Sequence, residues 1–312
     1  MRRVTSLVLV VAGAMAPSLP VWGDPQSQTQ PSAAPAPAAP STPPASAAPT
    51  AFDPSKSDEK AIAIADQVIA AMGGKAAWDS LHYVKLTFLV RQGDKRLGVR
   101  THYWDKQGSR SRMEGETREK KPVVAIVDHT SRQGQASVDG QLLFADDAKK
   151  YVDLAYGNLI NDTYWLFMPF KMKDPGVRLR YEGAVPDNKP MYDKIMLSFE
   201  DGIGLTSKDR YWLYVSRSTH MIERWSYVLQ GQGQAASPTA WQWEDWTTVG
   251  GLKVSTKRTQ DGGEVEIVLE GVQAFDSLPE AVFTTTGPVE GIGQPAPAAA
   301  ATEPPPASPG TP

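Results

Sequence analysis

The sequence predicts a mainly β (α+β) fold, a curled antiparallel incomplete barrel of about ten to twelve strands with an N-terminal helix and a helical lid. Three observations predict it. Apolar and polar residues alternate with period two through many short segments between 84 and 275. Breaks rich in Gly or in Asp and Asn separate most of these segments, as tight turns do. One long segment, 145–173, interrupts the series with the least β-like sequence of the domain.

The N-terminal helix is expected to start near residue 55. Ser55 and Asp58 have the spacing of a capping box, and Gly73-Gly74 ends the pattern. Between them an apolar stripe recurs at helical spacing, formed by Ile62, Ala65, Ile69 and Met72. A short turn with Trp78 and Leu81 then leads into the first strand.

The first strands show the alternation most clearly. Polar Lys85, Thr87 and Arg91 alternate with the apolar residues Val84, Leu86, Phe88 and Val90. After a turn at 92–94 the pattern repeats in Leu97, Val99, Thr101 and Tyr103. Further strands are predicted at about 108–115, 121–129, 134–144, 177–183, 192–200, 208–217, 220–230, 239–248, 252–260 and 264–275.

The helical lid is predicted from segment 145–173. Asp146-Asp147 is typical of a helix start, and Asn161-Asp162 is interpreted as a second cap. The run 164–170 that follows is apolar on every side, so it has to be buried on more than one face. A lid over the mouth of a curled sheet satisfies that requirement.

The N-terminus has the pattern of a secretory signal peptide, residues 1–23. A charged start precedes an apolar run at 4–16, which is too short to span a bilayer comfortably. Small residues at Val21 and Gly23 favour cleavage after Gly23. We expect an exported protein, periplasmic or secreted, with no integral membrane segment after cleavage. An uncleaved membrane anchor is the alternative.

Composition divides the rest of the chain. Residues 24–51 and 291–312 are almost entirely Pro, Ala, Ser, Thr, Gly and Gln, and we expect a disordered Pro/Ala-rich spacer and tail around one β domain at 52–290. The chain has 0 cysteines, so it lacks the residue that bacterial lipoproteins use for their anchor. With 41% hydrophobic residues the domain has enough apolar surface for an ordinary core.

Motifs and charge exclude several functions. The formal net charge of −3 argues against a nucleic-acid partner, which requires a concentrated basic surface. We find no cysteine nucleophile, no Gly-x-Ser-x-Gly elbow, no His-Glu-x-x-His helix and no phosphate-binding Gly-Lys-Ser/Thr loop. The 4 histidines show no metal-ligand spacing, and Asp128-His129 is interpreted as a capped turn. We therefore predict a protein that is not an enzyme and has no cofactor and no metal.

Aromatic residues at alternating positions are the unusual feature that remains. Trp225 and Tyr227 share one face of their strand, and Trp241 and Trp243 share one face of the next. Ordinary core filling explains such a pattern, and so does a cavity lined by amphipathic rings. The two interpretations are compatible, because a half-closed sheet has one concave face that is both core and pocket.

Several stretches resemble a known group of proteins, beginning with Tyr-Trp-Leu-Phe-Met-Pro-Phe-Lys-Met-Lys-Asp-Pro-Gly at 164–176. Tyr-Asp-Lys-Ile-Met-Leu-Ser-Phe at 192–199, Met-Ile-Glu-Arg-Trp at 221–225 and Trp-Gln-Trp-Glu-Asp-Trp at 241–246 fit the same group, as does Gly-Gly-Leu-Lys at 250–253. Together they resemble an exported bacterial family of unassigned function, similar to the periplasmic lipoprotein-carrier (LolA/LolB-like) superfamily. That resemblance implies an incomplete antiparallel barrel wrapped around a helical lid, with acyl chains bound between them.

The function expected from these observations is the binding or carriage of a hydrophobic ligand such as lipid or lipoprotein acyl chains. We expect the ligand-binding residues to be Phe88, Val99, Tyr103, Trp165, Phe167, Phe170, Leu197, Trp225, Tyr227 and Trp243. A non-enzymatic envelope interaction or structural module, with an envelope protein as its partner, is the alternative. An unrecognised hydrolase is the third reading, and the missing nucleophile–base pair disfavours it.

Overall fold

A computed structural model describes residues 51–185, 191–233 and 235–292. The predicted signal peptide, nearly all of the predicted spacer and most of the predicted tail lie outside these residues. The strands of the described chain are β1 (Tyr83–Gln92), β2 (Lys95–Asp105), β3 (Arg110–Glu116), β4 (Pro122–Asp128), β5 (Gly134–Val138), β6 (Gln141–Leu142), β7 (Val177–Val185), β8 (Tyr192–Phe199), β9 (Arg210–Ser216), β10 (Ile222–Val228), β11 (Thr239–Val249), β12 (Leu252–Gln260) and β13 (Val265–Phe275).

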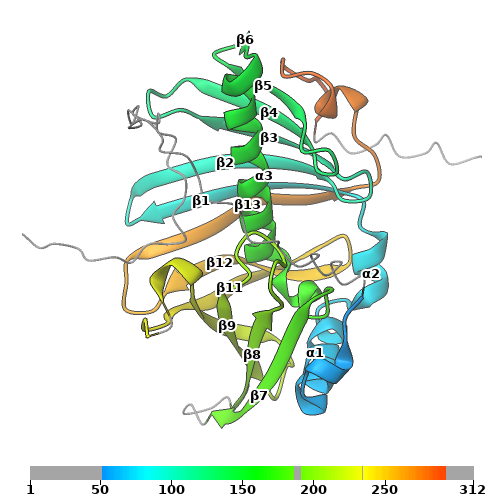
Figure 1. The fold of residues 1–312 in the computed structure, drawn as a ribbon, viewed down its shortest axis with the longest axis vertical. Helices are drawn as coiled ribbons and strands as arrows, with labels where there is room; N and C mark the ends of the chain where they lie inside the picture. The colour runs from blue at the N-terminus through cyan, green and yellow to red at the C-terminus, as the bar shows by residue number, and fades with distance from the viewer. Residues whose placement is uncertain (1–50, 186–190, 234, 293–312) are drawn as a thin grey trace, which may run out of the picture.

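These strands form one 13-stranded antiparallel sheet in the order β6-β5-β4-β3-β2-β1-β13-β12-β11-β10-β9-β8-β7. Sequence neighbours pair almost everywhere, and the pairing of β1 with β13 joins the two halves of the chain. Strands β6 and β7 end the order on its two sides, so the sheet is curled but not closed (Figure 1). The predicted incomplete antiparallel barrel is confirmed. The sheet has more strands than the ten to twelve predicted, because the predicted strand 134–144 is divided into β5 and the two-residue β6.

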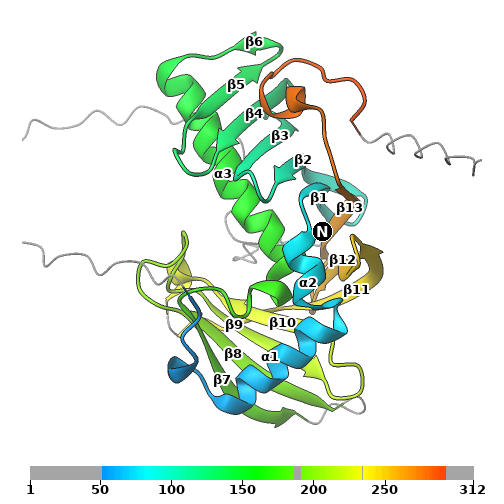
Figure 2. The same cartoon turned by 90° about the vertical axis from the view of Figure 1, so that its right-hand side faces the viewer.

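The helices are few. They are α1 (Glu59–Ala71), α2 (Gly74–Ser80) and α3 (Ala145–Phe167), with 3-10 turns η1 (Pro54–Lys56), η2 (Met168–Lys171), η3 (Gln230–Gln232) and η4 (Glu280–Phe283). Figures 1 and 2 show α3 lying lengthwise along one face of the sheet, which we call the inner face. Among the described residues, no helix is long and apolar enough to cross a membrane.

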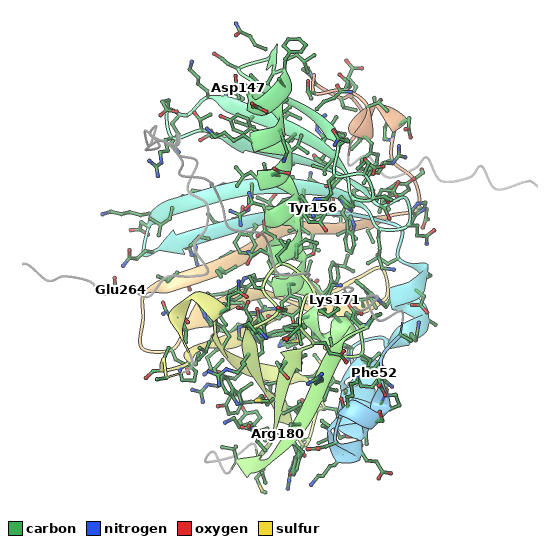
Figure 3. All side chains as sticks on the ribbon, in the orientation of Figure 1. Phe52, Asp147, Tyr156, Lys171, Arg180 and Glu264 are labelled. Carbon is green, nitrogen blue, oxygen red and sulfur yellow. The ribbon has the colours of Figure 1, made fainter. Side chains whose placement is uncertain are left out.

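The inner face is the apolar face of the alternating strands. Val84, Leu86, Phe88 and Val90 of β1 all point to it and are buried. They belong to the main core, in which the inner faces of both halves of the sheet pack against α1 and against the end of α3 with η2. A smaller cluster buries Val152 and Ala155 of α3 on β3, β4 and β5. Figure 3 shows the side chains on the ribbon, with Tyr156 labelled on α3. Helix α3 is therefore packed on the sheet from Val152 to its end at Phe167.

The outer face carries a third, small cluster. Tyr103 packs there with Val282 and Phe283 of the C-terminal segment. Arg112 fastens this segment, because its guanidinium donates to the carbonyl oxygens of Thr285 and Gly287. Figure 2 places the segment on the side of β2 and β3 away from α3.

The exposed edge of β7 is covered by the residues that precede α1. The backbone N–H of Asp58 donates to the Leu179 carbonyl at 2.9 Å, and the Asp58 carboxylate accepts from the Tyr181 N–H at 2.8 Å. Ser57 accepts from the Leu179 N–H at 2.9 Å. An unpaired strand edge invites aggregation, so these bonds protect the end of the sheet.

Three local expectations were wrong. Asp58 is the N-cap of α1, but its carboxylate binds β7 and forms no capping box with Ser55. Trp78 lies in helix α2 rather than in a turn. Asn161-Asp162 does not cap a second helix, because α3 runs without a break to Phe167. The sheet draws Asp162 into a buried ion pair, described below, and this long-range contact overrides its local preference for a cap.

Candidate ligand-binding site

The end of α3 places Trp165 at the centre of an aromatic cluster on the inner face. Its ring lies edge-on to Trp225 at a centroid distance of 4.8 Å and to Trp241 at 5.1 Å. Tyr227 and Phe88 complete its surroundings at 6.0 and 6.5 Å. Edge-to-face pairs at these distances each contribute about 0.5–1.5 kcal/mol beyond the burial of area. Trp165 is 3% exposed and is therefore buried.

A second aromatic group lies at the junction of α3 with η2 and α2. Phe170 stacks on Trp78 at 5.3 Å with an interplanar angle of 7°. Phe167 contacts the same indole at 5.2 Å and Trp104 at 6.3 Å. The predicted burial of the run 164–170 on more than one face follows from these contacts, which come from helix and sheet together.

The inner face brings most of the predicted ligand-binding residues together. Eight of them belong to the main core: Phe88, Trp165, Phe167, Phe170, Leu197, Trp225, Tyr227 and Trp243. Val99 and Tyr103 do not join them. Phe88 pairs with Arg100 across β1 and β2, so Arg100 shares the inner face. Val99 and Tyr103 lie one and three positions from Arg100 along β2, so their side chains point to the outer face. The expectation that Val99 and Tyr103 line the same cavity was wrong.

Arg258 is the functional candidate that the sequence did not reveal. Its side chain comes from the inner face of β12, is 0% exposed and stacks on the Trp243 ring at 3.7 Å. Its guanidinium donates to the carbonyl oxygens of Trp165 at 2.7 Å, Ser255 at 3.0 Å and Lys257 at 3.0 Å. It also donates to the Ser255 hydroxyl. Burial lowers the pKa of Arg258 well below the ordinary arginine value, because apolar surroundings disfavour its charge.

A buried polar triad lies farther along α3. Arg100 donates to both oxygens of Asp162 at 2.6 Å, and His102 lies 2.7 Å from the same carboxylate. Burial on its own would raise the pKa of Asp162, but the charge of Arg100 and the hydrogen bond from His102 lower it. The triad ties the middle of α3 to β2. Unlike the Arg100 charge, the Arg258 charge meets no carboxylate among the described residues.

Several buried donors near the aromatic cluster have no acceptor. They include Nε1 of Trp225, Nε1 of Trp243 and Nε of Arg258. The two indole rings contact each other at 5.6 Å, and Arg258 covers the ring of Trp243. Buried donors without a partner are rare in folded proteins, because each loses its bond to water.

A cavity of about 390 Å³ reaches this region from the surface. The pairing of β10 with β11 ends at Arg224 and Gln242, and beyond that point the cavity occupies the space between the two strands. Its walls are formed by Tyr192, Thr219, Met221, Glu223, Gln242, Trp243, Glu244 and Trp246. Trp243 therefore belongs both to the aromatic core and to the wall of an open cavity.

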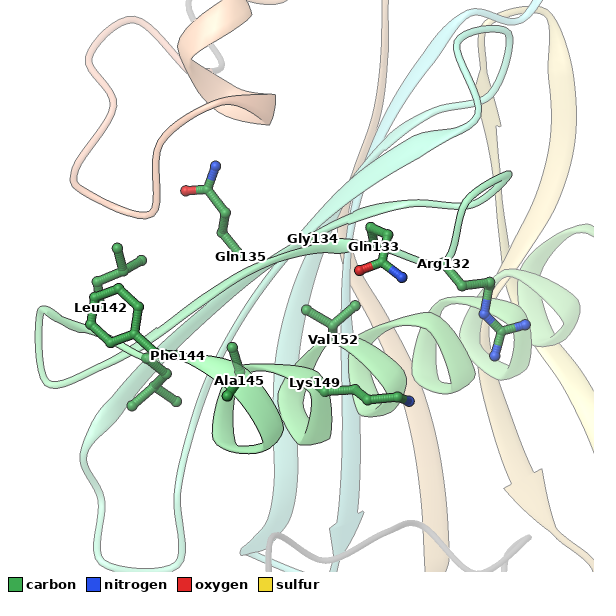
Figure 4. Close-up of a pocket in the computed structure, with 11 residues that line it drawn as sticks. Arg132, Gln133, Gly134, Gln135, Leu142, Phe144, Ala145, Lys149 and Val152 are labelled. Carbon is green, nitrogen blue, oxygen red and sulfur yellow. The ribbon is translucent and has the colours of Figure 1, made fainter.

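A second cavity, of about 350 Å³, lies between β5 and the start of α3 (Figure 4). Phe144 and Leu142 line it and are 74% and 46% exposed. Arg132 and Lys149 add positive charge to its wall. It is separate from the aromatic cluster and offers apolar side chains to solvent.

The remaining candidates have structural roles in the described chain. The Asp128 carboxylate accepts from the N–H groups of Thr130 and Ser131, so this turn is capped as predicted. His129 lies 2.9 Å from the Ser111 hydroxyl. Among the residues that the structure describes, no group of three His, Cys, Asp or Glu side chains is placed to hold a metal.

Comparisons with known proteins complete the description of the site. No family model matches the chain, and no curated protein matches it. Solved structures similar to it include a DUF1329 family protein from Desulfovibrio piger, at 11% identity and a TM-score of 0.41, over 72% of this chain and 98% of that one. A LolA superfamily protein from Nitrosomonas europaea has 11% sequence identity and a TM-score of 0.37, over 72% of this chain and 97% of the other. A domain from Vibrio parahaemolyticus named for outer membrane lipoprotein sorting has 8% sequence identity and a TM-score of 0.40. That match covers 72% of this chain and 96% of the other.

Proposed function

We propose that this protein is an exported binding or carrier protein for a hydrophobic ligand, such as lipid or lipoprotein acyl chains. The observation that carries the proposal is the double position of Trp243, which belongs to the aromatic core and to the wall of the open cavity. An apolar chain that enters between β10 and β11 meets the rings of the inner face directly. Ligand pockets combine apolar walls with polar groups, and this cavity places Met221, Trp243 and Trp246 beside five polar side chains.

The energetics suit an acyl chain. Each buried methylene contributes about 0.8 kcal/mol, so a chain of about 14 carbons offers roughly 10 kcal/mol before the costs of ordering. The cavity of about 390 Å³ lies within the range of small-molecule sites. The indoles of Trp243 and Trp246, which are amphipathic, form part of its wall.

The decisive experiment is native mass spectrometry of the protein purified from its own cell envelope. We expect a lipid to co-purify, and its mass identifies the class of cargo. Protein stripped of lipid should then bind a fluorescent fatty acid. A protein that carries no lipid and binds no apolar probe contradicts the proposal.

Export is part of the proposal and has its own test. The small residues Val21 and Gly23 favour cleavage after Gly23, so we expect the mature chain to begin at Asp24. N-terminal sequencing of the protein from the envelope fraction decides this. A chain that begins at Met1 would instead mean a retained anchor.

The second cavity favours one alternative function, a non-enzymatic envelope interaction module. Phe144 is 74% exposed beside Leu142, and exposed apolar groups of this kind often mark protein contacts. A photo-crosslinker placed at Phe144 should then capture one envelope protein, whereas the same group at the exposed Glu264 should not. Equal labelling from both positions removes this alternative.

A further inference from the structure

Arg258 carries a charge that the described structure does not balance. It is 0% exposed, and among the described residues no carboxylate forms an ion pair with it. Its acceptors are three carbonyl oxygens and the hydroxyl of Ser255. Removing an unpaired charge from water is among the most expensive events in folding, so an unbalanced buried arginine requires an explanation.

The end of α3 balances only part of the Arg258 charge. The Trp165 carbonyl that accepts from Arg258 belongs to the last turn of α3, where the helix presents a partial negative charge of about one half. That interaction accounts for one guanidinium nitrogen. Nε of Arg258 is buried and has no acceptor.

The neighbouring indoles provide a second, independent observation. Nε1 of Trp225 and Nε1 of Trp243 are also buried without an acceptor, and the two rings contact each other at 5.6 Å. The guanidinium of Arg258 lies on the ring of Trp243 at 3.7 Å. All three unsatisfied groups are N–H donors, so this part of the core lacks acceptors rather than donors.

We propose that Arg258, with the indoles of Trp225 and Trp243, forms a buried site for the carboxylate of a long-chain fatty acid. The inference rests on the function proposed above and names its ligand class. The carboxylate supplies the missing negative charge, and its two oxygens accept from the guanidinium and from the indole N–H groups. The alkyl chain lies among the rings of the inner face.

The open cavity gives this site its entrance. Trp243 lines the cavity and covers Arg258, so movement of this one indole connects the guanidinium with the opening between β10 and β11. Two carboxylates line the same opening, and both have partners. Glu223 accepts from the Tyr192 hydroxyl at 3.0 Å, and Glu244 lies 3.3 Å from the Lys257 ammonium.

The test compares palmitate with hexadecanol, which has the same chain length and no charge, on the full mature chain stripped of lipid. Displacement of a fluorescent apolar probe gives both affinities. We expect palmitate to bind about ten-fold more tightly or better, because a charge-assisted pair in an apolar site is strong. Carbon NMR of carboxyl-labelled palmitate should show that the bound carboxyl group stays ionised at pH values well below its ordinary pKa.

Arg258→Met tests the residue itself. It removes the charge and keeps an apolar side chain of similar length, a change that folded cores often tolerate. We expect the preference for palmitate to disappear while hexadecanol binds as before. Arg224→Met is the matched control on strand β10 of the same sheet, because it removes a partly exposed arginine that pairs with Asp261 at 2.7 Å. If Arg258→Met does not fold, Arg258→Lys takes its place and should weaken palmitate selectively.

The outcomes separate the two proposals. Equal affinity of the unchanged protein for palmitate and hexadecanol overturns the carboxylate site and leaves the hydrophobic carrier standing. An equal loss of preference in Arg224→Met also overturns it, because general surface charge would then explain the preference. Binding of neither ligand overturns the proposed function and the carboxylate site together.

Discussion

Asp162 of α3 and Arg100 of β2 form a bidentate ion pair inside the core. Both distances are 2.6 Å, and the side chains are 0% and 6% exposed. The pair joins the middle of the long helix to the sheet across 62 positions of sequence. Because the contact is buried and charged, it fixes how α3 lies on the inner face.

Breaking this pair from one side should be costly. Asp162→Ala leaves Arg100 buried without a counter-charge, and we expect a loss of about 3–5 kcal/mol in the free energy of unfolding. Denaturant titration measures it. The double variant Arg100→Met/Asp162→Leu removes both charges and should lose much less.

An exposed pair serves as the control. Arg91 and Glu266 form an ion pair in which the Arg91 side chain is 41% exposed. Arg91→Met should change stability by less than about 1 kcal/mol. A loss of that small size in Asp162→Ala would mean that the buried pair does not hold the helix.

Trp165 should behave as a core residue in the unliganded protein. Its ring touches those of Trp225, Trp241, Tyr227 and Phe88, so Trp165→Ala should cost about 3–5 kcal/mol. Affinity for a fluorescent fatty acid should fall as well. Trp212→Ala, at a partly exposed site on β9, is the matched control and should cost less. A small loss in Trp165→Ala would instead mean that Trp165 covers a partly empty pocket.

Alkaline pH should destabilise the fold through its buried tyrosines. Burial, helped by the charge of Glu114 and opposed by that of Arg112, raises the pKa of Tyr103 from 10.0 to about 12. Burial also raises the pKa values of Tyr164, Tyr211 and Tyr227. The unfolded chain therefore releases these protons first, and stability should fall as pH rises from 10.0 to about 12.

The absorbance of tyrosinate measures this directly. We expect four of the 10 tyrosines to resist ionisation in the folded protein and to ionise with the rest in denaturant. Tyr103→Phe should reduce the alkaline loss of stability. Ionisation of all 10 near the ordinary value in the native protein would contradict the burial of these rings.

Both termini should be dispensable for stability. Deleting 24–50 and 293–312 should leave the melting temperature nearly unchanged, because such Pro- and Ala-rich composition offers little apolar surface to bury. Ile292 packs on the outer-face cluster, so the C-terminal cut belongs after it. As the control, a deletion that extends to residue 276 removes Val282 and Phe283 and should lower the melting temperature clearly. A fall of several degrees in the shorter deletion would mean that a terminal segment packs on the domain.

The sequence by itself determined the sheet and the apolar character of the end of α3. Alternation along β1 is a local property, since successive side chains of any strand point to opposite faces. The burial of the run 164–170 was likewise predictable from its apolar composition alone. Turn chemistry at Asp128 was equally local.

Only the tertiary structure decided which residues meet. Whether Phe88 or Val99 faces α3 depends on strand register, which pairs Phe88 with Arg100 and turns Val99 outward. The burial of Arg258 under Trp243 and the ion pair of Arg100 with Asp162 join positions far apart in the chain. Charged side chains are usually solvated, so neither arginine stands out in the sequence, and the folded sheet is what removes both from water.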